Sequence, residues 1–97
     1  MRHEVVVAPE AVEDFRRLPA TVPSKVRDAI ETHLRHEPTK TGRSRIKRLR
    51  GMSRPQYRLR VDDVPVFYDV SDSVVEILAI VLKSKATEWL EQRGEEE

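Results

Sequence analysis

The chain has 97 residues, of which 38% are hydrophobic and 36% are charged, and its formal net charge at pH 7 is +1. We expect residues 1–97 to form a single domain with a modest hydrophobic core. The lack of cysteine excludes disulfides, thiolate catalysis and zinc–thiolate sites, and the longest apolar run, residues 77–82, is too short to span a bilayer. Because no hydrophobic signal core follows Met1, we expect a cytoplasmic protein.

The first 38 residues predict a strand followed by a helical hairpin. Glu4–Ala8 is short and rich in valine, which favours a strand. Pro9 suits the first turn of a helix, which Pro19 ends. Its apolar stripe contains Val12, Phe15 and Leu18. A second helix begins near residues 21–23 and ends at Pro38. Its apolar face contains Val26, Ala29, Ile30 and Leu34.

The second half of the chain predicts consecutive strands joined by tight turns. Arg45–Arg50 alternates weakly and is either a strand edge or a loop, and Gly51–Pro55 is a break. Three strands are expected beyond it, namely Tyr57–Val61, Val64–Val70 and Val74–Leu82. The last of these is almost wholly apolar, as a central strand covered on both faces would be. Ser84 can then cap a short helix over Lys85–Gln92.

This order of elements predicts an α+β fold. We expect an N-terminal strand, an α-helical hairpin packed on a 3–4-stranded, mainly antiparallel sheet, and a short C-terminal helix. The acidic tail, residues 91–97, either frays in solvent or folds back over the basic middle of the chain.

Nine of the 18 Lys and Arg residues fall between Lys40 and Arg60, a stretch without any Asp or Glu. We call this stretch the basic segment. A nearly neutral protein that concentrates one sign of charge in this way is expected to meet a polyanion, and phosphate groups are the obvious candidates. Arg58 and Arg60 share one strand face about 7 Å apart, which is close enough to grip one phosphate.

Three sequence runs and the order of the elements carry a resemblance to a known family. Residues 46–51 read Ile-Lys-Arg-Leu-Arg-Gly, residues 57–61 read Tyr-Arg-Leu-Arg-Val, and residues 66–70 read Val-Phe-Tyr-Asp-Val. Together with the apolar strand that ends at Lys83, they resemble the RelE/ParE superfamily of bacterial type II toxins over essentially the whole chain. The resemblance implies a small toxin that a cognate antitoxin wraps and neutralises. RelE-like members are ribosome-dependent mRNA endonucleases, whereas ParE-like members inhibit DNA gyrase.

The resemblance also implies where the chemistry would lie. RelE-like enzymes carry basic catalytic residues at positions that match Arg58 and Arg60, and another just past the last strand, for which Lys83 and Lys85 are the candidates. Binding of RNA or the ribosome is expected of Lys40, Arg43, Arg45, Lys47, Arg48, Arg50, Arg54 and Trp89. No metal and no cofactor is expected, because RNA cleavage by 2′-hydroxyl attack requires neither.

The chain departs from the RelE-like pattern at two places. Pro65 stands where these enzymes carry an arginine, and Trp89-Leu90 stands where they often carry a tyrosine or a His-Tyr pair. Since no histidine follows His36, the usual proton-transfer group is missing. A lysine with a lowered pKa is one replacement for it.

The leading hypothesis is the toxin of a type II toxin–antitoxin system, a RelE-like ribosome-dependent mRNA endonuclease that arrests translation and growth. Its partners would be a cognate antitoxin, the ribosome and mRNA. One alternative is a ParE-like inhibitor of DNA gyrase, and another is a degenerate member that only binds its antitoxin.

Structural explanations stand beside each functional one. Arg58 and Arg60 can form a solvated strand face or pair with antitoxin carboxylates, and residues 43–50 can serve solubility rather than dock on rRNA. Lys83 and Lys85 can compensate neighbouring carbonyls or Asp69. Trp89 can be a core residue. His33 and His36 have metal-ligand spacing but no third ligand, so we expect them to face solvent.

Overall fold

The computed structural model describes residues 2–41 and 45–97. Its helices are α1 (Pro9–Arg16), α2 (Val22–Ala29) with the π-helical continuation η1 (Ile30–Leu34), and α3 (Lys83–Arg93). Its strands are β1 (Glu4–Val7), β2 (Ile46–Arg48), β3 (Met52–Arg54), β4 (Tyr57–Val61), β5 (Val64–Ser71), β6 (Val74–Ile80) and β7 (Glu95–Glu96). In this described part, no helix is both long and apolar enough to cross a membrane. The expected α+β fold is confirmed.

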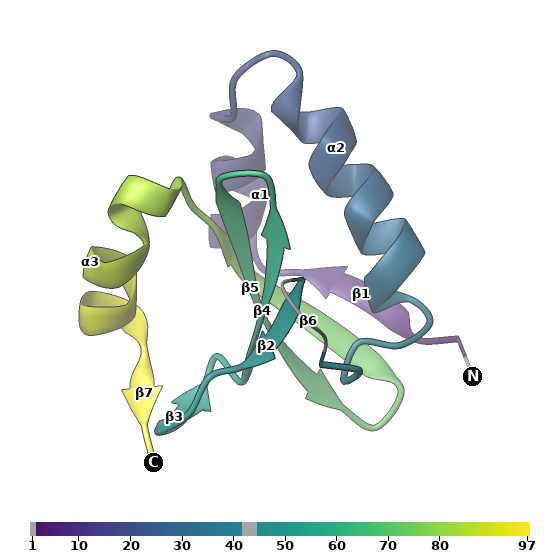
Figure 1. Cartoon of the computed structure of the whole chain (residues 1–97), viewed down its shortest axis with the longest axis vertical. Helices are drawn as coiled ribbons and strands as arrows, with labels where there is room; N and C mark the ends of the chain where they lie inside the picture. The colour runs from purple at the N-terminus through teal and green to yellow at the C-terminus, as the bar shows by residue number, and fades with distance from the viewer. Residues whose placement is uncertain (1, 42–44) are drawn as a thin grey trace.

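A five-stranded mixed sheet in the order β1-β6-β5-β4-β2 organises the molecule. The strand β1 runs parallel to β6, and the other neighbours are antiparallel. The helices α1 and α2 lie on one face of the sheet and α3 lies on the other (Figure 1). The sheet is wider than the 3–4 strands expected, because both β1 and β2 join it at its edges.

The main hydrophobic core lies between the sheet and the α1–α2 hairpin. Its fully buried members include Val26 and Leu34 from the second helix and Leu59 from β4. Tyr57 and Tyr68 stack with ring centroids 5.5 Å apart, and the Tyr68 hydroxyl donates a hydrogen bond of 2.6 Å to the Pro38 carbonyl. Both tyrosines therefore serve packing, as expected.

A bulge in β6 explains how one apolar strand serves both faces of the sheet. The register with β5 shifts between Phe67 and Tyr68, so that Ile77 and Ile80 both pack in the core under the helices. The Ile80 amide at this irregularity donates to the Asp14 carboxylate of α1 at 3.0 Å. A residue that the sequence places on the polar side of α1 thus satisfies a backbone group of the sheet.

Two tight turns join the antiparallel strands where they were expected. Asp62 between β4 and β5 and Asp72 between β5 and β6 have φ angles of 51° and 53°. Aspartate is one of the few side chains that tolerates this left-handed region, so both residues suit a two-residue hairpin turn. The first of these turns brings Asp62 and Asp63 to the site described below.

Three local expectations differ from the structure. Ala11 rather than Val12 is the buried residue of α1, and Val12 remains 37% exposed. The helix α3 begins at Lys83, two residues early, and Ser84 makes no capping hydrogen bond; the Lys83 amide instead donates to the Asp63 carbonyl at 2.9 Å. Residues 91–93 continue α3, and the acidic end pairs with β3 as β7, so the tail folds back on the basic segment, the second of the two alternatives, and does not fray.

Candidate functional site

The outer face of β4 carries the two arginines that the sequence singles out. Strand pairing places Arg58 opposite Phe67 of β5 and Arg60 opposite Pro65. On the other side, Lys47 of β2 lies opposite Arg58. Because Leu59 between the arginines is fully buried under the helices, the alternation of this strand directs both guanidinium groups to the face that α3 covers.

The helix α3 forms a wall beside these arginines. One face of the helix lines a pocket of about 250 Å³ and contributes Lys83, Ala86, Thr87 and Leu90 to it. The other lining residues are Leu49, Arg58, Arg60, Asp62, Asp63, Pro65 and Phe67, and we call this site the α3 pocket. Three of the four predicted catalytic residues therefore meet in one site. Lys85 is exposed and lies outside the pocket lining.

The environment of Arg58 is unusual for an arginine. Its Nε atom is buried and has no hydrogen-bond partner among the described residues. Burial and the neighbouring positive charge of Arg60 lower the pKa of Arg58 below its ordinary value, although arginine remains protonated at physiological pH. A half-buried guanidinium with an unused donor is well suited to an anion that enters the pocket.

A second hollow adjoins the α3 pocket at the edge of the sheet. It has a volume of about 730 Å³ and is lined by Ala29, His33, Arg45, Arg60, Val61, Asp62 and Asp63. We call it the edge cleft. The guanidinium of Arg45 lies 2.7 Å from His33 Nε2. Burial and the charge of Arg45 lower the pKa of His33.

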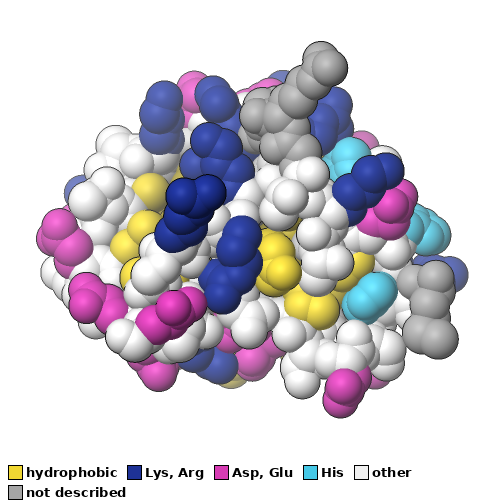
Figure 2. Space-filling view, turned by 60° about the horizontal axis from the view of Figure 1, so that its bottom comes forward, with side chains coloured by type: hydrophobic (Ala, Val, Ile, Leu, Met, Phe, Trp, Pro, Cys, Tyr) yellow, Lys and Arg dark blue, Asp and Glu magenta, His cyan; other side chains and the backbone are white. Residues whose placement is uncertain are grey.

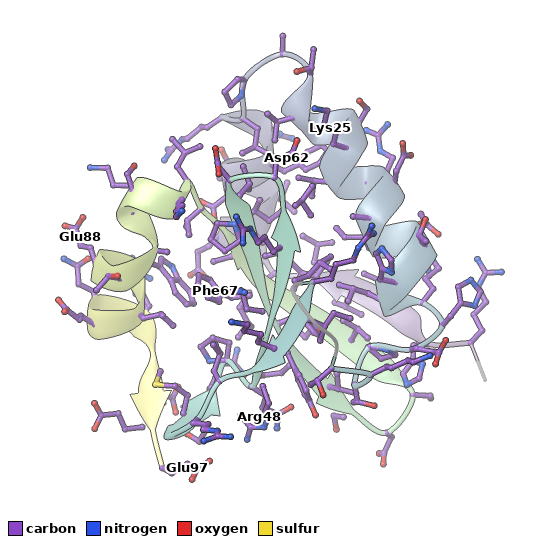
Figure 3. All side chains as sticks on the ribbon, viewed as in Figure 1. Lys25, Arg48, Asp62, Phe67, Glu88 and Glu97 are labelled. Carbon is purple, nitrogen blue, oxygen red and sulfur yellow. The ribbon has the colours of Figure 1, made fainter. Side chains whose placement is uncertain are left out.

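His33 was expected to face solvent, but the structure places it half-buried in this cleft. No spacing in the sequence signals the contact, because Arg45 lies twelve residues away on another element. Asp62 and Asp63 were read only as a turn, yet both line the α3 pocket and the edge cleft. The Asp62 carboxylate pairs with Lys25 of α2 at 3.0 Å (Figure 3).

Arg48 holds the loop that follows β2 in place. Its guanidinium donates to the carbonyls of Leu49, Met52 and Gln56 at 2.8, 3.3 and 2.9 Å. It lies 5.5 Å from the centre of the Tyr57 ring and pairs with Glu97 at 3.6 Å (Figure 3). The Nη1 atom of Arg48 makes all three of these hydrogen bonds, so it is already engaged within the chain.

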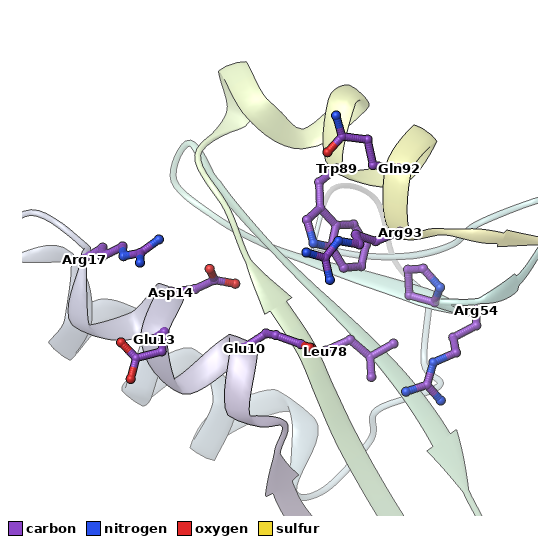
Figure 4. A pocket seen from close by; sticks show the side chains of 10 residues that line it. Glu10, Glu13, Asp14, Arg17, Arg54, Leu78, Trp89, Gln92 and Arg93 are labelled. Carbon is purple, nitrogen blue, oxygen red and sulfur yellow. The ribbon is translucent and has the colours of Figure 1, made fainter.

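Arg54 and Trp89 do not line the α3 pocket. Arg54 pairs with Asp69 at 3.5 Å and with Glu76 at 3.6 Å. The Trp89 ring stacks on Phe67 with centroids 5.0 Å apart and planes 4° apart. Both residues line a different cleft of about 420 Å³, in which α1 contributes Glu10, Glu13 and Asp14 (Figure 4). Arg17, Arg54 and Arg93 also line this cleft, so its three carboxylates offset its three guanidinium groups and leave no excess positive charge for a phosphate.

The remaining predicted binding residues that the structure describes lie at separate places on the surface. Lys40 pairs with Glu37 at 3.4 Å, and Arg50 is exposed beside Gly51. Arg43 lies outside the described residues. Figure 2 nevertheless shows Lys and Arg side chains gathered on one face, with most Asp and Glu side chains toward its margins. Among the described residues, no group of three or more His, Asp or Glu gathers in a way that would hold a metal ion.

The sequence and the fold were compared with known proteins. A family model described as the ParE toxin of the type II toxin–antitoxin system parDE matches residues 5–86. The chain belongs to this family of toxins. It is thus a RelE/ParE-superfamily toxin of the type II toxin–antitoxin class. No curated protein is similar enough in sequence to count as a relative.

Solved structures share the fold of this toxin. The RelBE2 toxin–antitoxin complex from Mycobacterium tuberculosis matches with a TM-score of 0.70 and 22% identity, over 84% of this chain and 99% of that one. The RelB–RelE complex from Methanococcus jannaschii matches with a TM-score of 0.67 and 17% identity, over 87% and 96%. The YoeB dimer from Staphylococcus aureus matches with a TM-score of 0.60 and 19% identity, over 81% and 94%.

Proposed function

We propose that this toxin arrests growth by cleaving mRNA on the ribosome, and that the α3 pocket is where the RNA phosphate binds. The observation that carries the proposal is the meeting of Arg58, Arg60 and Lys83 in one pocket, with a buried Arg58 donor left unused. A cluster of cations with an unused buried donor costs stability unless an anion can occupy it. The phosphodiester of RNA supplies that anion.

The pocket contains groups for each part of a cleavage reaction without a metal. The 2′-oxygen of RNA attacks the adjacent phosphorus, and the bond from phosphorus to the 5′-oxygen breaks. This leaves a 2′,3′-cyclic phosphate and a 5′-hydroxyl. Arg58 and Arg60 would stabilise the charge that develops on the phosphate oxygens. Lys83, which lines the same pocket, would give a proton to the leaving 5′-oxygen.

Asp63 is our candidate for the group that takes the 2′-proton. It lines the α3 pocket, and its side chain has no partner among the described residues, whereas Asp62 is held by Lys25. A carboxylate in the pocket could take the proton that the attacking 2′-hydroxyl loses. This candidate base replaces the lysine considered from the sequence, and the histidine or tyrosine that this chain lacks near its C-terminus.

Induction of the toxin without an antitoxin, followed by primer extension on cellular mRNA, tests the proposal. We expect growth arrest and new 5′ ends at codon boundaries. Asp63→Asn should abolish these ends while RNA binding by the purified protein persists or improves. Growth arrest with intact mRNA would contradict the proposal.

Gyrase inhibition is the second candidate, and two observations favour it. The matching family model is that of ParE, and Pro65 occupies the position opposite Arg60 where RelE-like enzymes carry an arginine. In this case the basic face would bind a protein without performing chemistry. A supercoiling assay with purified toxin and gyrase separates the two functions, since only the second predicts inhibition in the absence of ribosomes.

We further propose a cognate antitoxin as partner, as in the RelBE2 and RelB–RelE complexes that share the fold. An apolar groove of about 270 Å³ lies beside the helices. It is lined by Val5, Val7, Val12, Phe15, Arg27, Ile30, Glu31, Arg35, Ile77 and Ile80. Val7 and Val12 are 40% and 37% exposed there, so an amphipathic segment would bury apolar surface that water now contacts.

A further inference from the structure

The edge cleft continues the α3 pocket around one shared arginine. Arg60 and the turn residues Asp62 and Asp63 line both hollows. A nucleic-acid strand carries one phosphate per nucleotide, so a strand held in the α3 pocket presents a neighbouring phosphate on the far side of Arg60. The edge cleft is the hollow that this neighbouring phosphate would enter.

In the protein without RNA, the side chains of His33 and Arg45 contact each other. Arginine can only donate, so the 2.7 Å contact requires His33 Nε2 to accept, which means that the ring is neutral. Burial and the charge of Arg45 both lower the pKa of His33 and favour this neutral form. A phosphate in the cleft would attract the Arg45 guanidinium away from His33. It would also stabilise the protonated form of His33.

We propose that the edge cleft is a second phosphate-binding site for RNA, in which Arg45 turns from His33 to the phosphate while His33 takes up one proton from solvent. This inference rests on the proposed binding of RNA in the α3 pocket. His33 and Arg45 would then both donate to the phosphate, and the contact between them would no longer be needed.

Protonation of His33 changes the net charge around the cleft by a large fraction. Arg45 and Arg60 line it together with Asp62 and Asp63, and Lys25 neutralises Asp62. With His33 neutral, these five charged groups leave one net positive charge. Protonation of His33 doubles that charge, so binding of a polyanion and binding of the proton strengthen one another.

The sign of the pH dependence follows from this coupling. The pKa of His33 is lowered in the unbound protein and would be raised by the phosphate. RNA affinity should therefore increase as pH falls through the pKa of the complex and level off below the pKa of the unbound protein. One proton limits the slope to about tenfold in affinity per pH unit.

The test uses the whole purified chain and a fluorescently labelled RNA hexanucleotide, with anisotropy titrations from about pH 8 to about pH 5.5, around the ordinary pKa of histidine, at constant ionic strength. We expect severalfold tighter binding by the parent at the acidic end and a nearly flat profile for His33→Gln. His36→Gln, three residues further along, is the matched control and should retain the parent profile. In NMR titrations of the histidine rings, RNA should raise the pKa of His33.

Four outcomes would overturn the inference. A His33→Gln variant with the parent profile, or a His33 ring whose pKa does not move with RNA, removes the second site while leaving the α3 pocket intact. A parent that binds no RNA hexanucleotide at any pH removes the inference, whereas the proposed cleavage on the ribosome is tested separately by primer extension. Cutting of mRNA by Arg45→Ala at the parent rate and affinity would likewise exclude a phosphate contact in the cleft.

Discussion

The two faces of the five-stranded sheet are built from the same strands but covered in different ways. The face under α1 and α2 is a dry core, in which Leu59, Tyr68 and Ile77 are fully buried. The face under α3 is covered along part of its width, and Arg58 and Arg60 of β4 remain beside the helix with Lys83. A single strand with period two thus supplies core residues to one face and cations to the other, which lets stability and binding vary independently.

The largest effect is expected from the core face. Leu59→Ala removes a fully buried side chain and should lower the free energy of unfolding by about 2–5 kcal/mol. Urea unfolding followed by circular dichroism measures this loss. Arg58→Ala, one residue away, is the matched control and should change it by less than about 1 kcal/mol, because it removes a buried donor without a partner. Equal losses in the two variants would show that the faces are not independent.

The next largest effect is expected on mRNA cleavage, from substitutions on the face that carries Arg58 and Arg60. Arg58→Ala combined with Arg60→Ala should reduce mRNA cleavage by at least about 10²–10³-fold, the usual cost of losing one charge-stabilising donor, with little change in stability. Lys85→Ala is the control, because Lys85 lies on α3 but outside the pocket lining. Primer extension with matched toxin levels measures both. A loss with Lys85→Ala as large as with the double variant would shift the site toward the exposed side of α3.

A smaller effect is expected where α3 meets the sheet. Trp89→Ala removes the stack on Phe67, and a double-mutant cycle with Phe67→Leu should give a coupling of about 0.5–1.5 kcal/mol. Thermal or urea unfolding of the four proteins provides the measurement. If Trp89 instead stacks on RNA bases, the coupling would be near zero and Trp89→Ala would weaken RNA binding.

The smallest effect concerns the acidic end. Glu97→Gln should change the free energy of unfolding by no more than about 0.5 kcal/mol, because the pair with Arg48 is solvent-exposed. RNA affinity should rise slightly at low salt, since a nearby negative charge is removed, and this gain should vanish at high salt. Anisotropy at two salt concentrations measures it. A gain that persists at high salt would indicate that Glu97 occupies the RNA site directly.

The sequence predicts what depends on local periodicity. The alternation in 57–61 places Leu59 and Arg58 on opposite faces, and the structure agrees. The proline positions bound α1 and the second helix correctly to within a few residues, because proline is tolerated in the first turn of a helix but not in its interior.

Contacts between distant segments could not be predicted in the same way. The pairing of β3 with β7 joins Met52 to Glu96, and neither short segment has strand character of its own. The sequence suggests that the basic segment forms one surface. Contacts between distant segments divide it, because Arg48 binds loop carbonyls and Arg54 binds Asp69. The site around Arg58, Arg60 and Lys83 was anticipated as a set of residues, but the walls of the pocket depend on where α3 packs.

The two-stranded β3–β7 pairing has a mechanical consequence for α3. The helix is anchored at its first residue by the Lys83 amide on the Asp63 carbonyl, and just beyond its last by the Glu97 amide on the Gly51 carbonyl at 3.0 Å. Because both ends of α3 are held by hydrogen bonds, the helix cannot rotate away from the sheet about one end while both bonds remain. A ligand larger than the α3 pocket can therefore enter only after one of these hydrogen bonds breaks. The distance between α3 and the sheet thus limits the size of the ligand that the pocket accepts.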